Sequence, residues 1–272
     1  MLKLRVLTAL VLAPAIILAT LYLPHSGFAF LAALIFVLGA WEWGGLAGLS
    51  ATGRLGYAGL LGGLFAIAYS LMSLSATWVF PLIGVGLLWW MVALVLVLRF
   101  PAHGEFWSRS PAARSIAGLV VLLPAWAGLV LLHRANSHLA LLVMILVSFA
   151  DIGAYFAGRA FGRHKLAPQV SPGKTWEGLV GALAVTLFIG VGAARWLPVA
   201  PELTTLFVLL CMATVLVSVL GDLLESMFKR MAGAKDSGHL LPGHGGVLDR
   251  VDSLTAAAPV FAMGTYWLKV LA

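Results

Sequence analysis

The residues best able to do chemistry gather in one polar segment near the C-terminal end of the chain. Residues 226–252 mix glycine, lysine, arginine and aspartate in a sequence that is otherwise almost entirely apolar. Mixed acids and bases beside glycines suit the binding of metal-bound phosphates. We therefore expect the reaction centre here, among five of the ten carboxylates of the chain: Asp222, Glu225, Asp236, Asp249 and Asp252.

Asp222 and Asp249 are the best candidates for metal ligands. Asp222 has Ser226 and no base at i+4, so its partner must come from elsewhere, and a metal is the obvious one. The turn at Gly245 and Gly246 can bring Asp249 toward it. Mg²⁺ takes one or two carboxylates and completes its octahedron with water and phosphate oxygens. The sequence thus predicts a magnesium site, with three further acids as candidates around it: Asp151, Asp236 and Asp252.

Other polar residues of the segment carry weaker expectations. Glu225 lies four residues before Lys229, so we expect these two to pair and to extend together to the membrane surface. His239 and His244 are five residues apart without a cysteine or a third histidine nearby, which is a poor zinc pattern. We expect His244 to bind phosphate or to stabilise a turn, and the role of His239 stays open.

A second segment, residues 157–177, is also rich in glycine and basic residues and ends in Gly173-Lys174-Thr175. It is not a P-loop, because that motif requires glycine where Pro168 stands and a preceding strand that we do not expect. Lys174 and Thr175 nevertheless stand ahead of a predicted helix whose N-terminal amides could hold a phosphate. We expect both residues to contribute to substrate binding.

The composition fixes the environment of these residues. The chain is 62% hydrophobic and 10% charged, with a mean hydropathy of +1.04, which indicates a polytopic membrane protein and excludes a large soluble domain. Membrane segments must satisfy their own backbone, so we expect an all-α helical bundle. Nine stretches are long enough to cross: residues 6–23, 27–45, 55–74, 77–98, 116–132, 139–156, 178–197, 203–228 and 253–270.

The basic residues predict the orientation of the bundle. With the N-terminus in the cytoplasm, 14 of the 17 lysines and arginines fall on the inner side, as the positive-inside rule requires. The net charge of +7 is then mainly a topology signal, and we expect no nucleic-acid partner. We expect a multi-pass protein of a bacterial inner membrane with its active site on the cytoplasmic side.

The chain divides functionally at about residue 138. Residues 1–137 have short loops with few charges, and we expect them to form a transmembrane scaffold. Residues 138–272 carry the two cytoplasmic loops, 157–177 and 229–252, and we expect them to be the catalytic region. In Trp41-Glu42-Trp43 the tryptophans are typical interface anchors, and whether Glu42 approaches the site stays open.

The segment from Ser226 to Asp252 resembles the signature of phosphatidate cytidylyltransferases, also called CDP-diacylglycerol synthases. The segment from Asp151 to Gly178, which contains Ser171-Pro-Gly-Lys-Thr-Trp-Glu, resembles a second marked region of that family. Before the C-terminal half the likeness is only one of hydropathy. The signature positions are filled by Ser226, Phe228, Lys229, Arg230, Lys235, Asp236, Gly238, Pro242, His244, Gly245, Gly246, Val247, Asp249, Arg250 and Asp252.

The resemblance implies that CTP and phosphatidic acid react to give CDP-diacylglycerol and pyrophosphate, with Mg²⁺ required. A phosphate monoester is already largely ionised, so alignment and charge neutralisation would carry the catalysis. The family also implies a possible homodimer. The resemblance implies catalytic roles for Asp222, Asp249, Lys229, Arg230, Lys235 and Arg250, and substrate-binding roles for Lys174, Thr175, Ser226, His244, Gly245 and Gly246.

Two other functions stay open at this point. A cation transporter would also place carboxylates inside a helical bundle, although it needs no long loop rich in lysine, arginine and glycine. A CTP-dependent enzyme acting on another lipid phosphate would keep much of the same site chemistry. The acyl preference, the number of metal ions, the contacts to the cytosine base and the assignment of each base to a phosphate also stay open.

Overall fold

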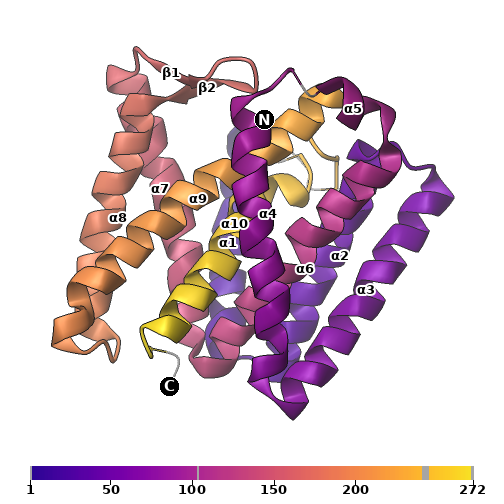
Figure 1. Cartoon of the computed structure of the whole chain (residues 1–272). Helices are drawn as coiled ribbons and strands as arrows, with labels where there is room; N and C mark the ends of the chain where they lie inside the picture. Colours follow the sequence, from indigo (N-terminus) through magenta and orange to yellow (C-terminus); the bar gives the residue numbers. More distant parts are fainter. Residues whose placement is uncertain (1, 103, 241–244, 271–272) are drawn as a thin grey trace.

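The computed structural model describes residues 2–102, 104–240 and 245–270, with side chains from residue 10 onward. In this part of the chain the predicted all-α membrane bundle is confirmed (Figure 1). Its helices are α1 Leu2–Tyr22, α2 His25–Leu46, α3 Ala51–Leu74, α4 Phe80–Leu98, α5 Gly104–Arg109, α6 Pro111–Ala135, α7 Ser137–Phe161, α8 Trp176–Trp196, α9 Thr204–Met231 and α10 Leu248–Trp267. Short 3-10 turns, η1 Ala76–Val79 and η2 Pro201–Leu203, precede α4 and α9.

Each of the nine predicted spans corresponds to one of the long helices. Among the described residues, seven segments are long and apolar enough to cross a membrane: α2, α3, α4 with η1, α6, α7, α8, and α9 with η2. The part of α1 whose side chains are described, Leu10–Tyr22, is apolar but shorter than such a segment. The first turns of helix α10 carry Asp249, Arg250 and Asp252, which lower its hydropathy. The number of membrane crossings and the orientation therefore stay predictions.

Helix α6 lies at the centre of the bundle, where α2, α3, α4, α7 and α10 contact it. Small residues permit these close contacts. A Cβ atom on Gly128 would come within 2.9 Å of the Ala258 carbonyl of α10. The Trp126 indole also donates a 3.2 Å hydrogen bond to the Ala29 carbonyl of α2. The outer faces carry exposed apolar side chains instead, such as Phe30 and Phe188, as expected for helices that contact lipid.

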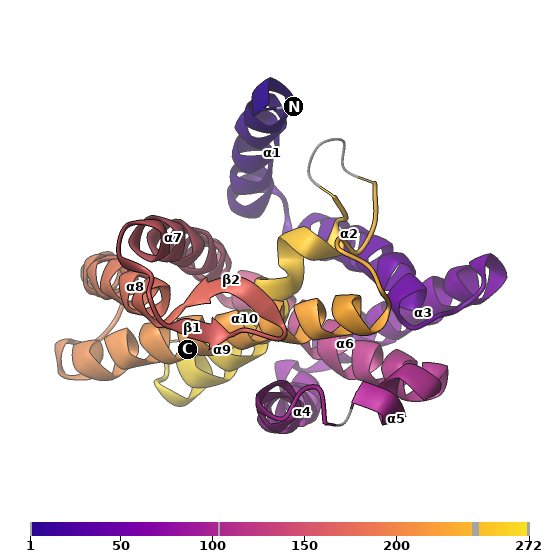
Figure 2. The same cartoon turned by 90° about the horizontal axis from the view of Figure 1, so that it is seen from above.

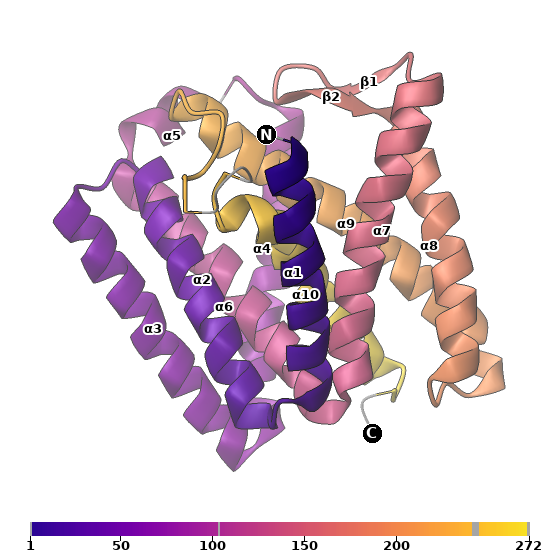
Figure 3. The same ribbon diagram turned by 180° about the vertical axis from the view of Figure 1, so that it is seen from behind.

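The elements that hold the polar residues meet at one end of the bundle. Helix α5, the turn of the hairpin β1–β2 and the connection from α9 to α10 all lie at the end where α1 begins (Figures 1 and 3). Seen from above, α9 and α10 lie between the pair α7–α8 and the group α2–α3–α6 (Figure 2). Residues from both halves of the chain can therefore reach the start of α10.

The boundaries around the polar segments differ from the predicted ones. Helix α9 continues to Met231, and α10 begins at Leu248, so Asp249 and Asp252 lie on the first turns of a helix. Residues 157–177 are not a plain loop either, since they contain β1 Lys165–Ala167 paired antiparallel with β2 Ser171–Thr175. The expectation that no strand precedes Lys174 and Thr175 was wrong. The P-loop is still excluded, because Pro168 replaces its glycine.

Candidate active site

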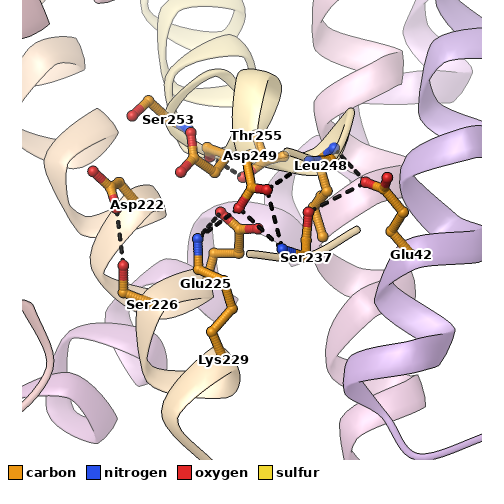
Figure 4. Close-up of polar contacts among 12 residues, drawn as sticks. Glu42, Asp222, Glu225, Ser226, Lys229, Ser237, Leu248, Asp249, Ser253 and Thr255 are labelled. Atoms are coloured by element: carbon orange, nitrogen blue, oxygen red, sulfur yellow. Dashed lines mark hydrogen bonds and ion pairs between the residues drawn. The ribbon is translucent and has the colours of Figure 1, made fainter. Parts of the chain in front are cut away.

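Two helices carry the acids of the site and face one another. The polar residues of α9 recur every three or four positions and so lie on one face of the helix. Opposite them, Asp249 lies on the first turn of α10 (Figure 4). Asp252 follows it at i+3 on the same helix. A Cβ atom on Gly221 would stand 2.6 Å from the Asp252 carbonyl oxygen, so glycine permits the close approach of the two helices. The polar face of α9 consists of Asp222, Glu225, Ser226 and Lys229.

Lys229 bridges two acids inside the protein. Its Nζ lies 2.7 Å from Asp249 Oδ1 and 3.3 Å from Glu225 Oε2. The pairing with Glu225 is therefore confirmed. The expected surface position is wrong, because the side chains of Lys229 and Glu225 are only 11% and 2% exposed. The acid on α10 holds the lysine inside, and nothing in the local spacing along α9 indicates that acid.

Asp249 organises the start of α10. Besides the ion pair with Lys229, its carboxylate accepts hydrogen bonds from the backbone amides of Ser237 at 3.0 Å and Gly246 at 2.8 Å. Gly245, which precedes Gly246, has a φ of +80°, a conformation that favours glycine. Asp249 therefore joins the described ends of the connection between α9 and α10, and its oxygens already have three donors.

Asp222 joins the two polar segments that the sequence shows separately. Its Oδ2 lies 2.6 Å from Lys174 Nζ, and its Oδ1 accepts a 3.1 Å hydrogen bond from Ser226. The partner from elsewhere in the chain is thus a lysine of strand β2. A carboxylate has about four lone-pair positions, so Asp222 retains acceptor capacity beyond these two bonds.

The acids form a continuous electrostatic network. Asp222 interacts with both Asp151 of α7 and Asp252, and Asp252 faces Glu225. Apart from the ion pair with Lys229, the buried oxygens of Glu225 have no hydrogen-bond partner in the described part of the chain. Two carboxyl groups in contact need a shared proton or a cation between them. Lys174, Lys229 and Arg250 are the basic partners of the network among the described residues, so its five carboxyl groups outnumber its bases.

A cavity of about 310 Å³ opens beside this network, between α7, α8 and α9. Asp151, Lys174 and Asp222 line its polar part. Tyr155 and Thr175 also belong to its wall. The cavity therefore offers space for a ligand next to both acidic and basic groups.

Thr175 has a structural role that the sequence did not indicate. Its side-chain oxygen accepts a 3.1 Å hydrogen bond from the Gly178 amide and so caps α8. Glu177, on the first turn of α8, lies 2.7 Å from the His164 ring. One amide at this helix end is therefore already satisfied. Substrate binding by Thr175 stays a prediction.

The remaining predicted residues are spread around the site. Arg230 donates a 3.3 Å hydrogen bond to the Val170 carbonyl and so ties α9 to the hairpin. Lys235 and Asp236 are exposed on the connection between α9 and α10. Arg250 is exposed on α10 and interacts with Asp151. His244 lies outside the described residues.

Glu42 of α2 is the residue whose approach to the site the sequence left open. It is 3% exposed, and its Oε2 accepts hydrogen bonds from the Leu248 amide at 2.7 Å and the Ser237 hydroxyl at 3.2 Å (Figure 4). A Cβ atom on Gly246 would lie 2.5 Å from the same oxygen, so the connection needs glycine there. A carboxylate inside an apolar span is itself a signal of function.

The tryptophan beside Glu42 does not anchor the protein at the interface. Trp43 is 2% exposed, and its indole donates a 2.8 Å hydrogen bond to the Arg114 carbonyl. Its ring also packs against Phe228 of α9, with 5.1 Å between the ring centroids. The expectation of an interface anchor was wrong for Trp43, because α6 and α9 cover this face of α2.

Comparison with known proteins agrees with the signature. The profile of the Cytidylyltransferase family matches residues 3–268. The chain is 48% identical over 266 residues to a protein of Pseudomonas aeruginosa named Phosphatidate cytidylyltransferase, covering 96% of each chain. A Haemophilus influenzae protein of the same name is 42% identical over 281 residues, covering 96% of this chain and 98% of its own. The resemblance seen in residues 226–252 thus extends over nearly the whole sequence, and the chain belongs to the cytidylyltransferase family.

Proposed function

We infer that this protein is an enzyme that transfers the cytidylyl group of CTP to phosphatidic acid, giving CDP-diacylglycerol and pyrophosphate. The observation that carries this inference is the 48% identity, over 96% of both chains, to a relative named for that activity. The site supports it, since a nucleotide from water and a lipid phosphate from the bilayer must meet at charged groups inside a helical bundle.

The chain's own residues serve this reaction by alignment and charge neutralisation. An oxygen of the lipid phosphate attacks the α-phosphorus of CTP, and the bond to the leaving pyrophosphate breaks. The lipid phosphate is already ionised, so the step needs no strong general base. Lys174 and Lys229 are held by Asp222 and Asp249, respectively, and such fixed cations stabilise the charge that develops during transfer.

Magnesium is the cofactor that we propose. The network holds more carboxyl groups than bases, and a polyphosphate brings further negative charge, so a cation that accompanies the polyphosphate would reduce the repulsion. Among the described residues no group of three or more acids, histidines or cysteines is placed to hold a metal. Mg²⁺ commonly takes only one or two protein carboxylates and uses substrate phosphates for the rest.

Asp222 and Asp249 were the predicted ligands of that ion. Asp222 fits, because its oxygens keep free lone pairs. Asp249 would have to give up donors that now bind it. Asp252 accepts a hydrogen bond from the Ser253 amide and interacts with both Asp222 and Glu225. We therefore propose Asp222 and Asp252 as the ligands and Asp249 as the residue that fixes Lys229 and the start of α10.

We assign the triphosphate of CTP to the cavity between α7, α8 and α9, because Lys174 and Asp222 line it. The end of the bundle that carries α5, the hairpin and the α9–α10 connection then faces the cytoplasm, where CTP is found (Figure 1). This location corresponds to a bacterial inner membrane, and a homodimer is proposed on the family resemblance alone.

The test is transfer of labelled CTP into lipid by the purified protein with phosphatidic acid and Mg²⁺. We expect label in the lipid phase, loss of it with a chelator, and recovery on addition of Mg²⁺. Asp222→Asn and Asp252→Asn should lower turnover by about 10²-fold or more, as loss of a principal electrostatic group does. Polyprenyl phosphate in place of phosphatidic acid is the control. Transfer to polyprenyl phosphate alone would contradict the substrate, and unchanged activity in Asp252→Asn would contradict its role as ligand.

A further inference from the structure

A second cavity of about 310 Å³ lies on another side of the acid network, between α1, α2, α7 and α10. Its walls are almost entirely apolar, and its lining also includes Arg250 and Ser148. Another apolar cavity, of about 430 Å³ between α2 and α3, has no charged residue among the described residues that line it. The apolar walls of the first cavity include Ile16, Ile17, Leu31, Ile35, Met144 and Ile145.

The polar end of the first cavity adjoins the active site. Arg250 lies between Asp249 and Asp252 on the first turns of α10 and interacts with Asp151. Ser148 lies one helical turn before Asp151 on α7, so both occupy the same face of that helix. The cavity with Lys174 and this apolar cavity therefore meet the acids at successive turns of α7.

We propose that the apolar cavity holds an acyl chain of the diacyl phosphate substrate, with the lipid phosphate beside Arg250. The proposal rests on the proposed function. A guanidinium is well suited to bind a phosphate. The cavity can fill from the bilayer, because Ile16, Ile17 and Ser148 in its lining are exposed on the faces of α1 and α7.

The acyl-chain site would serve to position the lipid phosphate. The bilayer is as apolar as the cavity, so moving a chain between them gains little hydrophobic free energy. A held chain fixes the depth and direction of the phosphate relative to the nucleotide, and correct placement of reacting groups accelerates bimolecular reactions strongly. The acyl-chain site therefore acts mainly on the rate of transfer.

Two matched variants test the proposal. Ser148→Trp fills the apolar cavity, and Ser26→Trp places the same side chain in the cavity between α2 and α3; both serines are exposed. We expect Ser148→Trp to lower kcat/KM for dioleoyl phosphatidate by about tenfold or more. Dihexanoyl phosphatidate has chains too short to need the cavity. With this lipid, Ser148→Trp should react at nearly the rate of the unmodified protein. Ser26→Trp should leave kcat/KM unchanged for both lipids.

An equal loss for both lipids in Ser148→Trp would overturn the acyl-chain site, as would no loss for either. A binding measurement separates this proposal from the reaction itself. Phosphatidate carrying a diazirine in its acyl chain is irradiated with the protein without CTP, and labelled peptides are identified. Labelling of residues 13–20 and 141–149 that decreases in Ser148→Trp and not in Ser26→Trp supports the site even if no transfer is detected. Labelling spread evenly over the outer helices would overturn it.

Discussion

Lys229 is the side chain on which the buried charge of the site depends. It lies between Glu225 and Asp249, which are 2% and 8% exposed, and removing its charge would leave both acids without their shared cation. Breaking a buried ion pair from one side costs about 3–5 kcal/mol. We expect Lys229→Met to lower the thermal unfolding temperature in detergent and to abolish transfer. The matched control is Lys269→Met at an exposed lysine, and equal melting temperatures for the two variants would contradict this account.

Glu42 gives a second prediction at the residue scale. Glu42→Ala removes the acceptor of the Leu248 amide and the Ser237 hydroxyl, and an unsatisfied buried donor costs about 1–3 kcal/mol. We expect reduced stability and a lower kcat, because the start of α10 loses its fixed position. Glu42→Gln keeps an acceptor oxygen and should restore most of both quantities.

The control for Glu42 is Glu105→Ala. The Glu105 side chain is 73% exposed, and its one ion-pair partner among the described residues is the exposed Arg109, so its loss should change stability by less than about 0.5 kcal/mol. Glu42→Gln that is as inactive as Glu42→Ala would show that the charge itself is required. The positioning role described here would then be insufficient.

At the scale of elements, the site depends on the close packing of α7 against α8. Helix α7 carries Asp151, and α8 begins two residues after Lys174. A Cβ atom on Gly181 would lie 2.8 Å from the Gly153 carbonyl oxygen. Gly181→Ala should therefore push the helices apart, at a cost of about 1–3 kcal/mol, and reduce turnover. Gly192→Ala on the same helix meets nothing within 4 Å and should leave activity unchanged. The measurements are the melting temperature and the transfer activity of both variants. Normal activity in Gly181→Ala would show that this contact does not position the site.

At the scale of the whole molecule, we predict the orientation of the bundle in the membrane from the end that carries the site. Ser108 on α5 lies at the end that carries the site, and Glu202 on η2 lies in the connection between α8 and α9. We expect a membrane-impermeant maleimide to label Glu202→Cys in intact bacterial cells and to label Ser108→Cys only after permeabilisation. The native Cys211 is buried and should add little background. The opposite pattern of labelling would reverse the proposed orientation.

The membrane bundle, the reactive segment and the family are all visible in the sequence. Hydropathy shows long helices because the bilayer forces each segment to satisfy its own backbone. The signature from Ser226 to Asp252 and the spacing of Asp222, Ser226 and Lys229 on one helix face are local properties, so they need no knowledge of distant contacts. The sequence therefore determined the class of protein and its family, and it predicted the region of the candidate site and most of its charged residues.

Only the tertiary structure decided how charges from different elements are paired. The link from Lys174 to Asp222 and the burial of Lys229 between two helices depend on which elements lie side by side. Glu42 meets its partners across 195 and 206 residues of sequence. The two cavities that flank the acids likewise form between helices from both halves of the chain. Contacts of this range follow from the packing of whole helices, which a local pattern of residue types does not specify.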